Sequence, residues 1–259
     1  MNKTLKVVRF HRKIAYKGTI GRTRERFCLN YIQHKQKWFR EIKKGQVKKA
    51  ASLGKTIYCR KGCYSCCDEP ISVSLQEGES IVYYLYQHEE VLHSFLVNFQ
   101  RWVDAAQKHA DILQQMSHIV TQGFADGISK EQMQALVEEQ GSRWWQLHIP
   151  CPLLTDGACS IYEVRPWVCA SVFATERCDP SRSNEITTYR ADLPSTIELP
   201  FYDERISVHY TGIMPSTIYG LLTGGFRFLS DIPGLESLLK EFSTDPEVRA
   251  FVKRAHDFH

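Results

Sequence analysis

The 259-residue sequence has no long hydrophobic run. No apolar stretch approaches the ~20 residues of a membrane-spanning helix. Near the start the longest apolar pair is Val7-Val8, whereas a secretory signal needs about 7–15 apolar residues in succession. We therefore expect a cytoplasmic protein that does not cross a membrane. The chain also has no internal repeat, no Ser/His/Asp order and no glycine-rich phosphate loop, so it gives no support for a solenoid, a triad hydrolase or a phosphate-loop enzyme.

Acidic side chains are scarce in residues 1–61. This segment holds 19 Lys and Arg residues but only Glu25 and Glu41, a local charge of +17, while the remaining 198 residues carry −13. The net charge of +4 therefore hides a cationic head, for which we expect an acidic partner: nucleic acid, an acidic protein, or the acidic remainder of the chain. The aromatic side chains of this segment share one helical stripe, which favours burial in the core over stacking on bases: Tyr31, Trp38 and Phe39.

The spacing of apolar residues is mostly helical. It predicts a helix over residues 23–53 with Gly54 as its stop, and capping boxes predict helices beginning after Ser74 and Ser129. Further helices are expected to about residue 120, with a break near His88, and over 129–140, 215–222, 234–242 and 246–256. Residues 1–21 read as an irregular arm, and 205–210 give a weak strand signal.

The expected fold is mostly α with minor β: a helical domain whose cysteine-bearing loops and short hairpin form a metal site. We expect three parts. Residues 1–54 form a basic arm and helix, 55–180 a cysteine-cluster metal-binding domain, and 181–259 a C-terminal α/β extension packed on it.

Cysteine is sparse and odd in number, with nine residues in all, which excludes a small disulfide scaffold. Four of the nine nevertheless fall within nine positions: Cys59, Cys63, Cys66 and Cys67. Spacings of two to four residues let a tight turn bring two thiolates to one metal, and Gly62 suits such a turn. Because adjacent side chains diverge, Cys66 and Cys67 indicate two nearby metals, a multinuclear cluster, or one ligand beside a reactive thiol.

A second, more widely spaced group consists of Cys151, Cys159, Cys169 and Cys178. Asp156-Gly157 predicts a hairpin between the first two. A two-residue loop would place Cys151 and Cys159 on opposite faces, so shared ligation predicts an odd loop. The ninth cysteine, Cys28, lies on the aromatic helix stripe and is expected in the core.

These motifs resemble the CxxCxxCC cysteine-cluster family of zinc- or iron-chelating domains. The resemblance is carried by CRKGCYSCC at 59–67, CPLL at 151–154, GACSIYE at 157–163, and Arg165-Pro166 followed by Cys169. A further downstream cysteine, here Cys178, is common in the family. The first spacing is three residues instead of the two in the family's name. The resemblance covers residues 55–180 and implies a metal-binding domain; one relative is a flagellin lysine N-methylase, which adds an enzyme hypothesis.

Eight sulfurs suit two tetrahedral zinc sites or an iron–sulfur cluster. The adjacent pair, and a supply of sulfur beyond one closed zinc site, favour an iron–sulfur cluster or iron, with zinc as the alternative. The spacing of the first three cysteines also matches radical S-adenosylmethionine enzymes, but the repeated βα units of that fold are missing. Arg165 and Tyr162 are candidates for residues that contact the metal ligands and hold them in position without binding the metal themselves.

The leading hypothesis is a cytoplasmic metal-binding protein with one cysteine-ligated iron–sulfur, iron or zinc centre, used either for redox chemistry or for protein modification if it is an enzyme. The alternative is a binding module with a structural zinc site, whose basic N-terminal segment contacts nucleic acid or an acidic protein.

Overall fold

The computed structural model describes residues 22–122, 127–178, 186–191 and 211–222. The fold is mostly helical with short strands, as predicted. The predicted arm 1–21, the strand at 205–210 and the helices at 234–242 and 246–256 lie outside the described residues. Among the described residues, no helix is both long and apolar enough to span a membrane.

In the described part of the chain, five α-helices precede the second cysteine segment. They are α1 (Arg22–Ser52), α2 (Leu75–Gln87), α3 (Glu89–Ala106), α4 (Ala110–Gln122) and α5 (Lys130–Trp145), with a short 3₁₀ turn η1 (Gln107–His109) between α3 and α4. The second cysteine segment contains η2 (Tyr162–Val164) and α6 (Trp167–Ser171), and α7 (Met214–Leu222) lies further along the chain.

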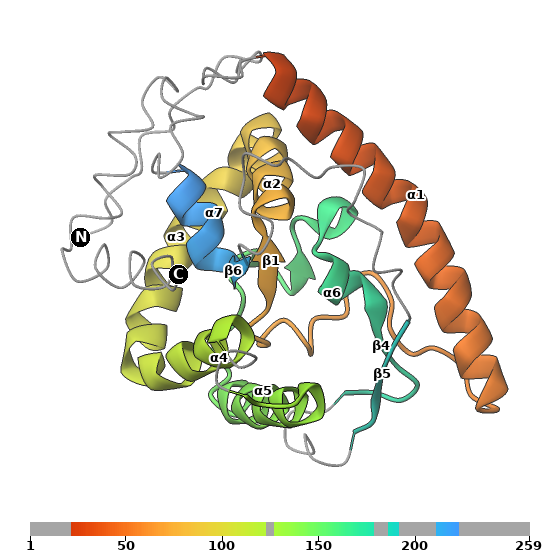
Figure 1. Cartoon of the computed structure of the whole chain (residues 1–259). Coiled ribbons are helices and arrows are strands. Elements are labelled where there is room, and N and C mark those ends of the chain that lie inside the picture. The colour runs from red at the N-terminus through yellow and green to blue at the C-terminus, as the bar shows by residue number, and fades with distance from the viewer. Residues whose placement is uncertain (1–21, 123–126, 179–185, 192–210, 223–259) are drawn as a thin grey trace.

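The described residues form three antiparallel strand pairs, of which the first joins segments far apart in the chain. They are β1 (Ser72–Ser74) with β6 (Thr211–Ile213), β2 (Leu154–Thr155) with β3 (Ala158–Cys159), and β4 (Val172–Ala174) with β5 (Thr188–Arg190). The first pair brings α7 beside α2, where it packs (Figure 1).

The helix boundaries follow their local signals. The Ser74 hydroxyl accepts the Glu77 N–H and caps α2, and Ser129 with Gln132 forms the complete capping box of α5. The helix predicted over 129–140 continues to Trp145. The chain breaks at His88 as predicted, and Gly54 ends α1 with φ of 66°.

The main core lies between α2, α3, α4 and α7, and Cys28 of α1 is buried in it. The Cys28 thiol donates to the Glu79 carbonyl at 3.8 Å, so its predicted core position is confirmed. A smaller core joins Ile42 of α1 to Trp167 and Ala170 of α6. Val47 is an apolar residue of α1 that is nevertheless exposed. It lies one position beyond the inward-facing Gln46, so its side chain turns to solvent.

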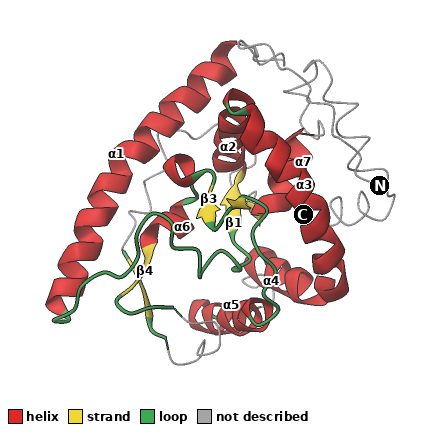
Figure 2. Ribbon diagram, turned by 180° about the vertical axis from the view of Figure 1, so that it is seen from behind, coloured by secondary structure: helices red, strands yellow, loops and turns green. Residues whose placement is uncertain are grey.

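Helix α1 runs along one edge of the molecule and contacts both α2 and α6 (Figures 1 and 2). Figure 2 shows the cysteine-bearing loops, in green, between α1 and the remaining helices. The second cysteine segment therefore lies against α1, which contacts its elements η2 and α6.

Candidate metal centre

The first cysteine segment follows α1 and consists of tight turns. The Cys63 N–H donates to the Arg60 carbonyl at 3.0 Å, and the Cys67 N–H donates to the Tyr64 carbonyl at 2.8 Å. Gly62, inside the first of these turns, has φ of 87°, a conformation that glycine adopts without strain. The closely spaced cysteines of this segment therefore lie in successive tight turns, as is typical of metal-ligand loops.

Hydrogen bonds join this segment to the second one, about a hundred residues later. The Cys151 N–H donates to the Cys67 carbonyl at 2.7 Å. The Ser65 hydroxyl donates to the Cys178 carbonyl at 3.2 Å, and the Ala174 N–H donates to the Cys59 thiol sulfur at 3.1 Å. The two cysteine groups therefore meet in space, at the junction of the first loop with β4 and the turn before β2.

The hairpin of the second segment corrects one prediction. Leu154 pairs with Cys159 and Thr155 with Ala158, so the loop is the two-residue Asp156-Gly157 and not an odd loop. Both residues have positive φ, 50° and 72°, as a tight hairpin turn demands.

Cys151 still lies near Cys159, because the strand does not extend back to Cys151. The Leu154 N–H instead donates to the Cys151 carbonyl at 2.9 Å, which makes a turn over residues 151–154. The alternation of strand faces therefore does not apply to Cys151.

Four cysteines influence one another electrostatically around Cys66. Cys66 is exposed as a residue, yet desolvation by the surrounding protein raises the pKa of its thiol to about 12, and charge on Cys59 and Cys63 acts in the same direction. Burial raises the pKa of Cys178 to about 11, again with Cys59 and Cys63 as its main charged neighbours. We call these four the first group: Cys59, Cys63, Cys66 and Cys178.

The other four form a second group: Cys67, Cys151, Cys159 and Cys169. Burial raises the pKa of Cys151 to about 12, and charge on Cys159 adds to this effect. Burial and then charge on Cys66, Cys151 and Cys159 raise the pKa of Cys67. Burial also raises the pKa of Cys169, with charge on Cys66 and on the rest of the second group acting in the same direction. Cys66 therefore lies at the border between the groups.

These groups are neighbours and not a formed coordination shell. Within the described ranges, no three His, Cys, Asp or Glu side chains are placed so that they could hold a metal ion together. The grouping depends on the shared electrostatic influence of the thiols and on the backbone contacts between their loops. The donor chemistry, eight thiols in two sets of four, suits metals that prefer sulfur.

Arg165, predicted to support the ligands, lies beside the second group. Its guanidinium stacks 3.9 Å from the centroid of the Tyr162 ring and 4.8 Å from that of Phe39, and it donates to the Tyr162 carbonyl at 2.6 Å. Its charge favours the ionised form of Cys159 and opposes the rise that burial causes in the pKa of that thiol. Tyr162 is half-buried and acts as the platform that orients Arg165. A role of either residue at a bound metal stays a prediction.

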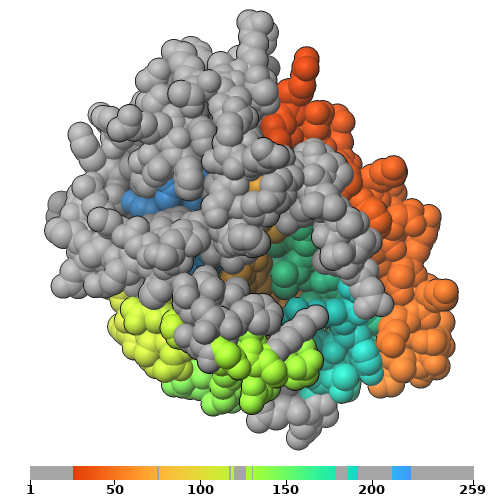
Figure 3. All heavy atoms as spheres, viewed as in Figure 1, coloured from red at the N-terminus to blue at the C-terminus, as the bar shows by residue number. Residues whose placement is uncertain are grey.

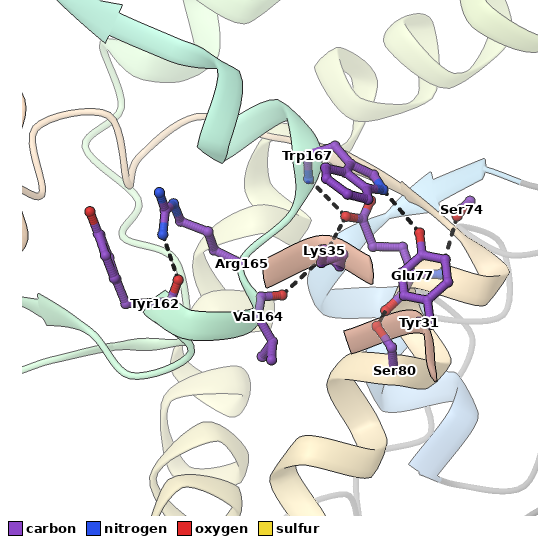
Figure 4. Close-up of polar contacts among 9 residues, drawn as sticks. All are labelled: Tyr31, Lys35, Ser74, Glu77, Ser80, Tyr162, Val164, Arg165 and Trp167. Carbon is purple, nitrogen blue, oxygen red and sulfur yellow. Dashed lines mark hydrogen bonds and ion pairs between the residues drawn. The ribbon is translucent and has the colours of Figure 1, made fainter. Parts of the chain in front are cut away.

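A buried ion pair, which was not predicted from the sequence, joins α1 and α2 near the start of α6. The Lys35 ammonium of α1 is 2.7 Å from the Glu77 carboxylate and donates to the Val164 carbonyl at 3.1 Å (Figure 4). The same Glu77 oxygen accepts the Trp167 N–H at 2.8 Å. This network joins α1 and α2 to the start of α6, the helix that contains Cys169.

A signal for this pair is present in the sequence. Lys35 lies on the inward-facing side of α1, where buried residues recur at helical spacing. The other buried residues of this side include Cys28, Tyr31, Ile42 and Gln46. A lysine at such a position needs a buried anion or acceptor. The net charge summed over residues 1–61 does not show that one of its lysines is buried and paired.

One comparison with known proteins identifies a family. Residues 58–189, slightly more than half of the chain, match the model of a family described as "CxxCxxCC: Putative zinc- or iron-chelating domain". A search of curated proteins and a search of solved structures found no match. The matched range contains both cysteine groups and begins just after α1.

Proposed function

The chain belongs to the CxxCxxCC family, and from this premise we propose that it binds two metal ions, each through four cysteine thiolates. The first group would hold one ion and the second group the other. The metals would lock the two cysteine segments together at the rim of the helical core.

The observation that carries this proposal is the separation of the adjacent pair Cys66 and Cys67. The Ser65 hydroxyl, just before Cys66, donates to the Cys178 carbonyl at 3.2 Å, whereas the Cys67 carbonyl accepts the Cys151 N–H at 2.7 Å. Charge on Cys66 also raises the pKa of Cys67 and of Cys169, as expected of a residue at the border of the two groups. Because neighbouring side chains diverge along an irregular loop, such a pair can serve two sites at once. Each site then has the four ligands that a closed tetrathiolate site requires.

This division changes the balance between metals. The sequence favours iron on two grounds: the adjacent pair Cys66 and Cys67, and a supply of eight sulfurs that exceeds the needs of one closed zinc site. Two groups of four remove that excess, and we therefore propose zinc in both sites. Zn²⁺ with four thiolates supplies structural stabilisation.

The same division bears on enzyme activity. Catalytic zinc sites keep one coordination position for water or substrate, and two sites of four cysteines each leave none. The proposal is therefore a binding module with structural metal, the alternative hypothesis of the sequence analysis, and not a redox or protein-modifying enzyme.

Metal analysis of anaerobically purified protein tests the proposal. We expect two zinc ions per chain, a colourless solution and no acid-labile sulfide. Iron with sulfide and broad visible absorption would overturn the choice of zinc.

Single Cys→Ser variants test the division into two sites. Cys63→Ser and Cys159→Ser should each lose one metal and keep the other, while Cys28→Ala, in the core, should keep both. Complete metal loss in each single variant would show one shared centre and refute the two-site arrangement.

A further inference from the structure

The outer face of α1 is a strongly basic surface. Figure 3 shows this helix, in orange, forming an edge of the molecule with its outward side uncovered in that view (Figure 3). We define the basic face as the exposed cations of this helix: Arg26, Lys37, Arg40, Lys43, Lys44, Lys48 and Lys49. Glu41 is exposed among them and pairs with Lys44 at 2.8 Å.

Helical geometry aligns most of these cations. Five of them recur at intervals that keep them within one side of the helix: Arg26, Lys37, Arg40, Lys44 and Lys48. At 1.5 Å rise per residue the four cations from Lys37 to Lys48 form a row about 17 Å long, and Arg26 lies about 17 Å before it. A straight row of this length matches several consecutive phosphates of an extended nucleic-acid strand, which a compact acidic side-chain cluster would not fill.

The cationic surface continues into the first cysteine segment. Lys43 lies near enough to Cys59 for its charge to favour the thiolate, and Lys55 and Arg60 of the following loop are exposed. The basic face and the metal-binding loop are therefore neighbours.

Two exposed aromatic rings lie in this loop. Tyr58 is 40% exposed and Tyr64 is 54% exposed, although large aromatic side chains usually bury most of their surface. Each flanks a cysteine of the first group, so the turns of that segment present both rings to solvent. The exposed cations Lys55, Arg60 and Lys61 alternate with these rings along the same segment. Exposed aromatics among cations are the combination that binds single strands, because bases stack on the rings while phosphates track the charge.

We propose that the basic face of α1, together with Tyr58 and Tyr64, binds single-stranded nucleic acid. The phosphates lie along the helix and bases stack on the two tyrosines. The inference goes beyond the proposed metal sites, because it concerns the surface outside them and does not depend on which metal they hold.

The test uses full-length, metal-loaded protein and a fluorescein-labelled 15-nucleotide oligothymidylate, with binding followed by anisotropy. Removing α1 would not serve, because the helix contributes buried residues to both cores. We expect log Kd to depend on log salt with a slope of about 3 or steeper, since each phosphate contact contributes about 0.7 on single strands.

Two double variants separate charge from stacking. Arg40→Glu with Lys48→Glu should weaken binding at least tenfold and reduce the salt slope by about 1.4. Tyr58→Leu with Tyr64→Leu should weaken binding by about thirtyfold or more and leave the slope unchanged. The control, Arg101→Glu with Lys108→Glu, changes two exposed cations on α3 and η1, across the molecule from α1, and should bind like the unmodified protein. Unchanged metal content and helical circular dichroism establish that each variant is folded.

Three results would overturn the proposal. The first is no detectable binding at 50 mM salt. The second is equal loss of affinity in the control variant. The third is equal or tighter binding of a polyglutamate peptide of matched charge, which would assign the surface to an acidic protein. A duplex of the same length that binds as tightly as the single strand would remove the stacking role.

Discussion

At the scale of single residues, the best-defined feature is the buried pair of Lys35 and Glu77. Lys35 is fully buried, with its ammonium also 5.3 Å from the centroid of the Trp167 ring. Such a pair contributes little net stability compared with apolar residues, but removing one partner leaves the other charge buried without compensation. Its structural effect here is to fix the junction of α1, α2 and α6.

Lys35→Met should therefore be strongly destabilising. We expect the free energy of unfolding to fall by about 3–5 kcal/mol, measured by urea denaturation at a fixed metal concentration. Lys37→Met, two positions along and exposed, is the matched control and should change stability by less than about 0.5 kcal/mol. The double variant Lys35→Met with Glu77→Gln should recover part of the loss. Equal stability of the two lysine variants would contradict this account.

At the scale of elements, α1 acts as the clamp of α6. At the far end of that short helix, the Gln46 amide donates to the carbonyls of Ala170 and Ser171 at 2.8 and 3.1 Å. These carbonyls lie at the helix end, where no intrahelical donor is available. Lys35 and Glu77 hold the start of α6 and Gln46 holds its end, so the position of Cys169 depends on α1.

Gln46→Leu should consequently loosen α6 while leaving α1 helical. Losing the donor leaves buried carbonyls unsatisfied, at a cost of about 1–3 kcal/mol. We also expect faster transfer of one of two metals to a competing chelator, because Cys169 belongs to the second group. Gln36→Leu, exposed on the same helix, is the control. If both metals leave faster to the same extent, the effect is global and the clamp is not specific to the second group.

The positions of the helices could be predicted from the sequence, but the contacts between distant segments could not. Helix positions followed from local signals such as Ser74, Ser129 and Gly54, which act within one turn. The prediction of an odd number of residues in the loop between Cys151 and Cys159 was wrong. It assumed that the strand extends back to Cys151, whereas the backbone hydrogen bond of Cys151 to Leu154 shows a turn there. The grouping of Cys178 with Cys59 could not be predicted, because it depends on β4 packing beside the first loop, a contact between residues over a hundred positions apart.

At the scale of the whole molecule, the two cysteine groups differ in their relation to the core. Cys151 and Cys159 pack against the main hydrophobic core, whereas the first group lies outside it. Most of the helical residues that the structure describes belong to α1–α5 and α7, which are held by apolar packing and not by the cysteines. This chain therefore has the means to keep its helices without metal, unlike small domains in which a metal site replaces the core.

Removal of metal should consequently produce local loosening and not global unfolding. After treatment with a chelator and a thiol reductant, we expect most of the helical circular dichroism to remain and the melting temperature to fall, because a ligand that binds only the folded state stabilises it. Trypsin should then cut faster after Lys55, Arg60 and Lys61 in the first cysteine segment, as local unfolding exposes that loop. Cleavage after Arg101, within α3, serves as the internal control and should stay slow. Collapse of the helical signal on chelation would show that the metal sites organise the whole fold, and unchanged cleavage of the first segment would show that its cysteines are not held by metal.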